Sequence, residues 1–224
     1  MKIADIKTIA EKDAKAREYK PSRYGDWMED VLGQAVGFVL DLGAGDGAFT
    51  GPLLERGRKV VSADLTHARL VKLKALNNLL VECDATNLPF KQGVFDAILF
   101  VEVLEHLPDR KTQSEAIKGF VHALKKGGRI VLTTPNRPVY RVMLKLWGWF
   151  GGQKPDPTHF SELTLGELLE LMREDCEVGF VRGKVGLVPI KAVQRFFSRW
   201  PSLCYDILVV ARPKWSPAER DGKN

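Results

Sequence analysis

From residue 38 onward, short runs of apolar and β-branched residues alternate with longer amphipathic stretches. This alternation is typical of βαβ units, in which parallel strands share one sheet and helices cover its faces. It predicts strands at 38–42, 59–63, 79–83, 95–101 and 129–134. Helices are expected at 48–57, 66–75 and 109–126, the last ending at Gly127 and Gly128, where glycine supplies a left-handed C-cap.

The last part of the chain carries a different pattern. A helical segment at 167–173 precedes two β-like runs at 178–185 and 204–212, and the separation of these runs favours an antiparallel pair with a long connection. The 224 residues suit one α/β domain. Its composition, with 45% apolar and 28% charged residues, is that of a packed globule and excludes disordered and fibrous proteins.

Cysteine usage and the apolar runs indicate where the protein works. Cys83, Cys176 and Cys204 are far apart and odd in number, which favours a reduced, cytoplasmic setting. The N-terminal stretch is charged and has no signal-peptide core. The longest apolar stretch, 139–150, contains two basic residues and is shorter than the ~20 residues of a spanning helix, so no transmembrane helix is expected.

A glycine-rich loop, GAGDG from Gly43, follows the first predicted strand and leads directly into a helix. Such a loop lets backbone N–H groups approach a polar ligand, but taken alone it equally suits an ordinary strand-to-helix turn. Asp64 ends the second strand, where an acid can accept hydrogen bonds from both ribose hydroxyls or cap the helix from Thr66. Asp84 ends the third strand, where it could accept a bond from the adenine amine or act as a capping acid.

In order and spacing, these motifs resemble the class I S-adenosylmethionine-dependent methyltransferases, in particular the type 11 and quinone-biosynthesis domains. The resemblance covers about 38–135. It is carried by VLDLGAGDG, the acids in SADLT and ECDATNLPF, FDAILFVEVLEHL and LKKGGRIVLTTPN. A nicotinamide-binding fold usually shows GxGxxG and lacks the last two elements, so a dehydrogenase is less favoured. Lys126, where many relatives have proline, departs from the pattern at a loop position.

The resemblance implies a Rossmann-like, doubly wound, mostly parallel seven-stranded sheet with an antiparallel last strand and a helical cap. It also implies S-adenosylmethionine as cofactor. Asp41 with Gly43, Ala44 and Gly45 would hold the methionine end, and Asp64 the ribose hydroxyls. The adenine would lie between Leu65, Asp84 and the Ala85 amide, and Val101 would line the sulfonium pocket.

The transfer itself needs mainly alignment of acceptor, methyl carbon and sulfur, but a hydroxyl acceptor would benefit from a base such as His106 or His159. Glu102, Glu105 and His106 would share one face if they were helical. Oxygen-methylating quinone-pathway and RNA 2′-hydroxyl enzymes are similar here and use an ExxEH cluster with a divalent metal. Many metal-free relatives share EVLEHL, so no metal is assigned, and the alternative is that these residues shape the loop.

His159 lies in an insertion that is expected to cover the cofactor, so it is a candidate to face the acceptor. The alternative is a loop histidine that caps a helix begun near Ser161 or Thr164. The stretch 19–27 could form a flap that brings Arg23 to the cofactor carboxylate.

Two segments around 137–150 and 190–200 combine an apolar and aromatic face with basic residues every four positions: Arg137, Arg141 and Lys145, then Lys191, Arg195 and Arg199. Three interpretations remain open: a two-helix lid packed on itself and the sheet, peripheral contact with an anionic membrane, and RNA binding. RNA is the least favoured, because aromatic and charged residues occupy opposite faces. The net charge of +6 therefore points to this cap, since 178–215 holds seven basic residues and one acid.

Together, these features predict a cytoplasmic methyltransferase, monomeric or homodimeric, that acts on a small apolar, amphipathic or lipid-like acceptor. The alternatives are an RNA or protein methyltransferase and a non-catalytic S-adenosylmethionine-binding protein. The expected plan is an N-terminal helical flap, a cofactor-binding core, a two-part cap, and a C-terminal helix with antiparallel strands, at 1–37, 38–135, 136–165 with 186–203, and 166–185 with 204–212.

Overall fold

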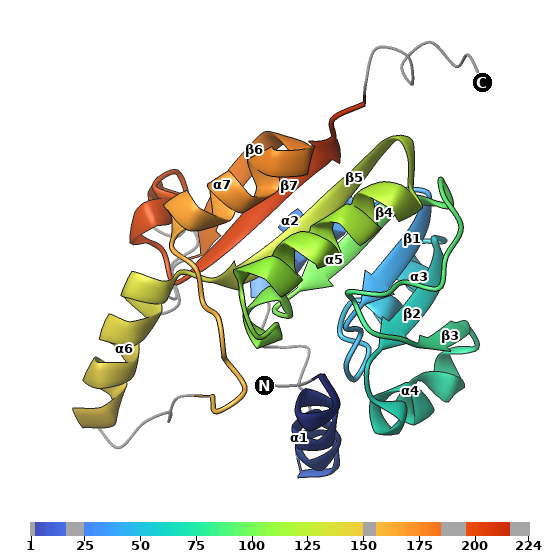
Figure 1. The fold of residues 1–224 in the computed structure, drawn as a ribbon, viewed down its shortest axis with the longest axis horizontal. Helices are drawn as coiled ribbons and strands as arrows, with labels where there is room; N and C mark the ends of the chain where they lie inside the picture. Colours follow the sequence, from blue (N-terminus) through green and yellow to red (C-terminus); the bar gives the residue numbers. More distant parts are fainter. Residues whose placement is uncertain (1–2, 17–24, 150–155, 185–195, 216–224) are drawn as a thin grey trace.

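The computed structural model describes residues 3–16, 25–149, 156–184 and 196–215. These ranges contain strands β1 (Phe38–Leu42), β2 (Lys59–Asp64), β3 (Leu79–Glu82), β4 (Phe95–Val101), β5 (Leu124–Pro135), β6 (Cys176–Lys184) and β7 (Asp206–Pro213). They form one sheet in the order β3-β2-β1-β4-β5-β7-β6 (Figure 1). β7 runs antiparallel to both of its neighbours, and the pairs among β1 to β5 are parallel. The predicted fold class is confirmed.

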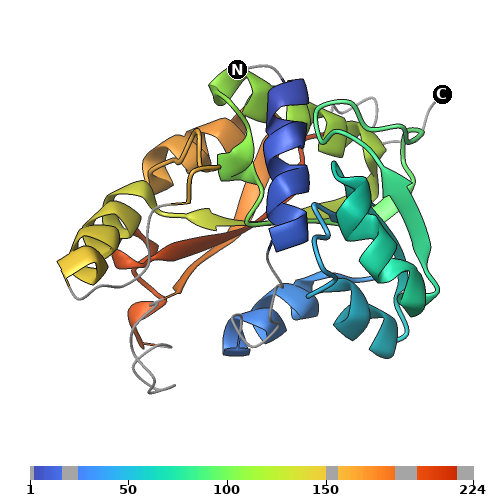
Figure 2. The ribbon, with the colours of Figure 1, turned by 90° about the horizontal axis from the view of Figure 1, so that it is seen from below.

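The helices cover both faces of this sheet (Figure 2). They are α1 (Ile3–Ala16), α2 (Gly25–Gln34), α3 (Thr50–Glu55), α4 (His67–Leu73), α5 (Arg110–Ala123), α6 (Arg137–Trp149) and α7 (Leu165–Asp175). α5 and α7 bury Phe120 and Leu171 in one core layer, and α2 and α3 bury Val31 and Leu53 in the other. Within α5, the buried residues recur with helical spacing, which gives the apolar stripe that packs on the sheet.

The helix expected at 109–126 ends earlier, at Ala123. Leu124 adopts an extended conformation and pairs with Phe95 at the start of β4. The register then shifts before pairing resumes at Arg129, and Gly127 takes its positive φ of 80° inside this irregular stretch. The helix C-cap assigned to Gly127 is therefore wrong: the glycine serves a strand irregularity, not a helix end.

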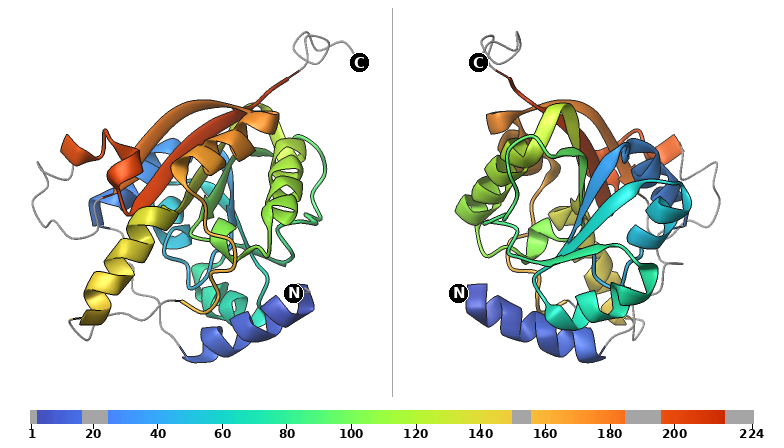
Figure 3. Two further views of the ribbon diagram at one scale, coloured as in Figure 1. Left: turned by 60° about the vertical axis from the view of Figure 1, so that its left-hand side comes forward. Right: turned by 90° about the vertical axis from the view of Figure 1, so that its right-hand side faces the viewer.

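The chain reverses its direction of winding between β1 and β4, because β2 and β3 lie on one side of β1 and β4 on the other. In sheets of this kind, ligands bind at that switch point, outside the carboxyl ends of the strands. α1 packs against α4 near this edge, and α6 extends away from the sheet body (Figures 1 and 3). Among the described residues, no helix has the length and apolar character needed to cross a membrane.

The cap is described only in part. The first segment contains α6 and the loop from residue 156. An isolated β-bridge between Asn136, just before α6, and Leu163 in the loop connects the two. The second segment is described only from residue 196, so Lys191 and Arg195 lie outside the described residues, as does Arg23.

Candidate active site

The glycine-rich loop is held in place by the neighbouring strand. The N–H groups of Gly43 and Ala44 both donate to the Ala63 carbonyl at the end of β2, at 2.8 and 3.0 Å. Gly43 has a φ of +74°, and a Cβ there would lie 2.4 Å from Cγ2 of Val103. Only glycine meets both demands, so this position requires glycine for the turn and for its packing against Val103.

Asp64 links that loop to the second strand. Its Oδ2 accepts the Gly45 N–H at 3.0 Å, and its Oδ1 accepts the N–H and hydroxyl of Thr66. The N-cap of α4 is Thr66, and the His67 amide donates to Glu11 of α1, so Asp64 does not cap this helix. A carboxylate can accept about four hydrogen bonds, which leaves Asp64 capacity toward the cavity it lines.

A single cavity of about 250 Å³ runs along the carboxyl ends of β1, β2 and β4. Every residue proposed for cofactor binding lines it: Asp41, Gly43, Ala44, Gly45, Asp64, Leu65, Asp84, Ala85 and Val101. Asp84 closes a turn by accepting from the Thr86 N–H and hydroxyl, so it does not cap a helix. Motifs that are far apart in the sequence therefore line the same cavity.

Asp41 lies deepest in this wall and is 3% exposed. Burial raises the pKa of its carboxyl to about 6, and the nearby Asp64 charge adds to that rise. The hydroxyl of Thr50 donates to Asp41 Oδ2 at 2.6 Å and opposes it. A carboxyl in this state is ionised at neutral pH but close to its titration range, so a cation nearby would stabilise the charged form.

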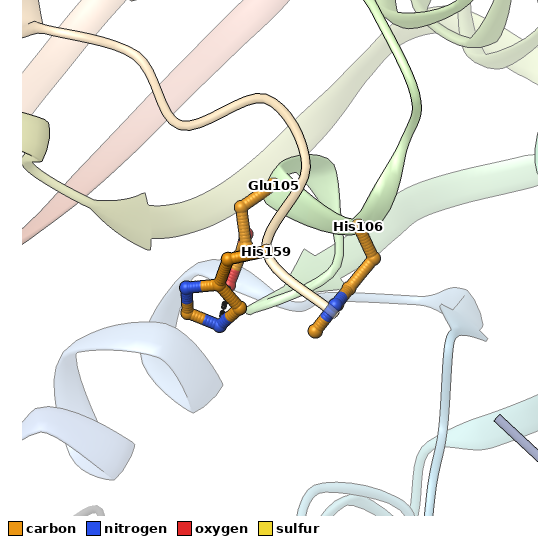
Figure 4. A group of neighbouring side chains, drawn as sticks. All are labelled: Glu105, His106 and His159. Carbon is orange, nitrogen blue, oxygen red and sulfur yellow. Dashed lines mark ion pairs between the residues drawn. The ribbon is translucent and has the colours of Figure 1, made fainter. Parts of the chain in front are cut away.

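Glu105, His106 and His159, called here the histidine–glutamate cluster, stand at the other end of the cavity (Figure 4). Glu105 and His106 lie in the 3-10 helix η3 (Leu104–His106), whereas His159 comes from the cap loop. The two imidazole rings meet edge to face with centroids 5.0 Å apart. His159 Nε2 lies 3.9 Å from Glu105 Oε1, and the ligand atoms of all three side chains lie within 4.8 Å of one another.

Glu105 is the electrostatic centre of the cluster. Its Oε2 accepts from the Thr134 hydroxyl at 2.9 Å, while its Oε1 is buried with no hydrogen-bond partner. Burial, followed by the neighbouring charge of Glu102, raises the pKa of Glu105 well above the usual range. Burial, and then the charge of His159, lowers the pKa of His106. The cluster is therefore poised for protons or for a cation, which are the two ways to satisfy a buried carboxylate.

The helical condition considered for Glu102, Glu105 and His106 is not met. Glu102 has a φ of +55° and precedes η3, so Glu102, Glu105 and His106 do not share a helix face. Glu102 Oε1 accepts from the Thr133 hydroxyl, and His159 takes the third place beside Glu105. The alternative, that these residues shape the loop, is also realised, because the Glu105 carbonyl accepts from Phe160 and Ser161.

His159 does not cap a helix. The N-terminus of α7 is closed by a capping box between Thr164 and Glu167. His159 Nδ1 instead lies 3.3 Å from Glu162 Oε1. The histidine thus lines the cavity, and its contact with the acceptor stays a prediction.

Several cavity residues were missed by the sequence analysis. Ile6 and Ala10 of α1 line it, so the N-terminal cover begins well before the stretch 19–27. Arg69 lines it from α4, and Tyr140 and Tyr205 line the acceptor end. Tyr140 lies in the segment predicted as part of the cap but was not singled out there, and its ring lies 5.2 Å from that of His159. Nothing in the local sequence around Arg69 or Tyr205 marks them as site residues.

A glycine loop at the switch point and an acid at the end of the next strand define a nucleoside-cofactor site of the methyltransferase type. The family described as "Methyltransferase domain" matches residues 16–175. The chain belongs to this family, and its fold is that of the class I S-adenosylmethionine-dependent methyltransferases.

Individual relatives agree with this assignment. The ubiquinone biosynthesis O-methyltransferase of Idiomarina loihiensis is 36% identical over 113 residues, which are 47% of this chain and 45% of that one. The tRNA (carboxymethyluridine(34)-5-O)-methyltransferase of Arabidopsis thaliana is 27% identical over 127 residues, 54% of this chain and 30% of that one. The chain thus spans about half or less of the length of these curated relatives. The structure of the CcbJ methyltransferase from Streptomyces caelestis superposes with a TM-score of 0.68 at 14% identity, covering 91% of this chain and 96% of that one.

The residues present fit S-adenosylmethionine, the methyl donor of this class. The fit rests on the glycine loop, whose Gly43, Ala44 and Gly45 line the cavity, and on three carboxylates that line it at successive strand ends. These carboxylates, Asp41, Asp64 and Asp84, suit the positively charged and hydroxyl-bearing parts of the cofactor.

Proposed function

We propose that this chain methylates a hydroxyl group of a small amphipathic acceptor that enters over the histidine–glutamate cluster. The observation that carries the proposal is the single cavity, which joins the carboxylates at the strand ends to His159. At the acceptor end, its walls are aromatic, with Tyr140 and Tyr205. Such walls suit a flat apolar molecule with few polar groups.

When bound, S-adenosylmethionine supplies an activated methyl group on a sulfonium sulfur. The chain's contribution is to align the reactants. Asp64 would accept a hydrogen bond from a ribose hydroxyl, Asp41 and the glycine loop would hold the methionine end, and Val101 would border the sulfonium. His159 accepts the acceptor's hydroxyl proton at Nε2 as the carbon–oxygen bond forms and the carbon–sulfur bond breaks. Positioning of this kind accounts for most of the catalysis that a methyl transfer needs.

The histidine–glutamate cluster would also suit a divalent cation, because the unpartnered Glu105 oxygen and two imidazoles are common ligands of such ions. Glu105, His106 and His159 would hold it, and it would bind the acceptor oxygen. The proposed mechanism uses proton transfer to His159 and no metal ion. Treatment with a chelator distinguishes this mechanism from one that depends on a bound cation.

The direct test combines cofactor binding with turnover on a panel of phenols, catechols and long-chain alcohols. His159→Asn should lower kcat by about 100-fold or more while the S-adenosylmethionine dissociation constant stays within twofold. His122→Asn on α5, away from the cavity, is the matched control and should be neutral. Asp64→Ala should abolish cofactor binding. Binding by the wild type without turnover on any acceptor would favour a non-catalytic binding protein.

An RNA acceptor is the alternative. The acceptor end carries Glu102 and Asp156, whose carboxylates disfavour a phosphate backbone. Binding of total RNA at low salt that weakens steeply as salt rises would support the alternative, and its absence would dismiss it.

We further infer peripheral contact with an anionic membrane. On α6, Leu146 is 42% and Trp149 84% exposed, and from 196 onward Trp200 and Leu203 are also exposed beside Arg199. An apolar surface with basic neighbours is the composition of an interfacial segment. Co-sedimentation with vesicles containing phosphatidylglycerol should fall when Trp149 and Trp200 are replaced by Ala, and equal sedimentation would remove this inference.

A further inference from the structure

The carboxylate of Glu162 is buried between the cap helix and His159. Its side chain is 8% exposed, although it precedes α7 in a loop. Oε1 lies 3.3 Å from His159 Nδ1, and Oε2 lies 3.4 Å from Nε of Arg141 on α6. The two oxygens thus have different partners, which fixes the plane of the carboxylate.

The polar groups of Asp156 and His106 near His159 have other partners, whereas Glu162 lies within hydrogen-bond distance of Nδ1. Asp156 Oδ1 is taken by the N–H and hydroxyl of Thr158, and His106 Nδ1 lies 2.9 Å from the Thr158 carbonyl. The phenol ring of Tyr140 stacks beside the imidazole at 5.2 Å with a 32° tilt. The rings of His106 and Tyr140 contact the imidazole, and among the described residues it is the Glu162 carboxylate that lies against Nδ1.

A carboxylate beside Nδ1 selects one form of a neutral histidine. A carboxylate only accepts hydrogen bonds, so Nδ1 carries the proton and donates it. Nε2 then keeps its lone pair. That nitrogen faces the cavity end where Glu105 Oε1 lies 3.9 Å away, which is too far for a direct hydrogen bond and leaves the lone pair available.

We propose that Glu162 is the positioning residue for His159: it fixes the Nδ1–H tautomer and aims Nε2 at the acceptor, while Arg141 holds the second Glu162 oxygen. This rests on the proposed function for its catalytic consequence. The tautomer and the orientation of the ring follow from the contacts alone. Arg141 is 67% exposed, so its ion pair contributes little stability by itself and serves to orient the carboxylate.

The arrangement connects α6 to the chemistry. Tyr140 and Arg141 are adjacent in the first turns of α6. Tyr140 contacts the His159 ring, and Arg141 contacts the Glu162 carboxylate. The basic stripe predicted for this helix is therefore used in part inside the protein, since Arg137 also pairs with Glu167. A displacement of α6 would move both supports of His159 together.

The test measures the tautomer of His159 directly, by long-range proton–nitrogen NMR correlation in ¹⁵N-labelled protein, with His159→Asn identifying the signal. The wild type should show protonated Nδ1 and unprotonated Nε2. Glu162→Ala should remove this preference, whereas Glu162→Gln, which keeps an acceptor oxygen of equal reach, should retain it. A wild-type spectrum with the proton on Nε2, or an unchanged tautomer in Glu162→Ala, would overturn the proposal.

Kinetics supply the second measurement. Glu162→Ala should lower kcat about 10- to 100-fold, as loss of an orienting partner typically does, with KM changed less than threefold. Glu162→Gln should recover most of this loss, and Glu170→Gln, an exposed glutamate on α7, is the matched control. Thermal unfolding and cofactor affinity identify a variant that merely fails to fold. If His159→Asn is fully active while the tautomer behaves as stated, the proposed base is wrong and the positioning by Glu162 stands.

Discussion

Asp41 should make cofactor binding depend on pH between 5 and 7. Burial raises the pKa of this carboxyl to about 6. The proposed site places the cationic methionine end of S-adenosylmethionine against Asp41. The cation stabilises the ionised carboxylate, so binding at acidic pH must release the proton that Asp41 holds in the free protein.

The magnitude follows from the pKa of about 6. A carboxyl with that pKa is about 90% ionised at pH 7 and about 10% ionised at pH 5. If only the ionised form binds, the association constant falls about tenfold over this range, which corresponds to about 1.4 kcal/mol. The stability of the folded protein should depend on pH in the opposite direction from cofactor affinity. Because the pKa of Asp41 is raised in the folded state, its protonated form stabilises that state, and this contribution is lost as pH rises from about 4 to about 6.

Titration calorimetry in two buffers of different ionisation enthalpy measures both quantities. At pH 5, binding should release close to one proton per cofactor, and at pH 7 about a tenth of that. Asp41→Asn should bind more weakly at pH 7 and lose most of the pH dependence. Equal affinity of the wild type at pH 5 and pH 7, without proton release, would show that Asp41 does not face a positive group of the cofactor.

Three further predictions concern the loop, the C-terminal helix and the cluster. Gly43→Ala should lower the free energy of unfolding in urea by about 1–3 kcal/mol, because of the positive φ and the contact with Val103, and should weaken cofactor binding. Gly51→Ala, at a position with open space around it, is the control and should not lower this free energy. Thr164→Ala removes the capping box of α7 and should lower the unfolding free energy by about 1 kcal/mol, with a smaller change opposing the assigned cap. Treatment with a chelator should leave activity within twofold, while a loss restored by Mg²⁺ would assign the histidine–glutamate cluster to a cation.

The cofactor half of the site could be predicted because it depends on local pattern. Each of its carboxylates lies at or next to the carboxyl end of a strand, and these ends meet at one edge of a parallel sheet. Once the strands were identified, Asp41, Asp64 and Asp84 had to lie together, and all three line the cavity. The glycine loop added its own signal, since three glycines in five residues fit the positive φ values that the structure shows.

Two local details could not be predicted, because tertiary contacts override local preference. Leu124 leaves the helix to pair with Phe95, although the sequence as far as 126 is compatible with a helix. Glu102 takes a positive φ that non-glycine residues rarely adopt, and its side chain is held there by Thr133 on the neighbouring strand. The conformations of both residues depend on the pairing of β4 with β5. The two strands are far apart in the sequence, so no short window contains both.

The acceptor half depends entirely on long-range contacts. His159 was a candidate because it lies in an insertion near the expected cofactor, but its role depends on which atoms meet its two nitrogens. Those atoms come from Glu105, 54 positions earlier, and from Glu162, whose second oxygen is oriented by a residue of α6. In any other loop conformation, the same histidine could have pointed to solvent. The chemistry proposed for this chain therefore follows from the packing of the cap loop against η3, where the Glu105 carbonyl accepts from the N–H groups of Phe160 and Ser161.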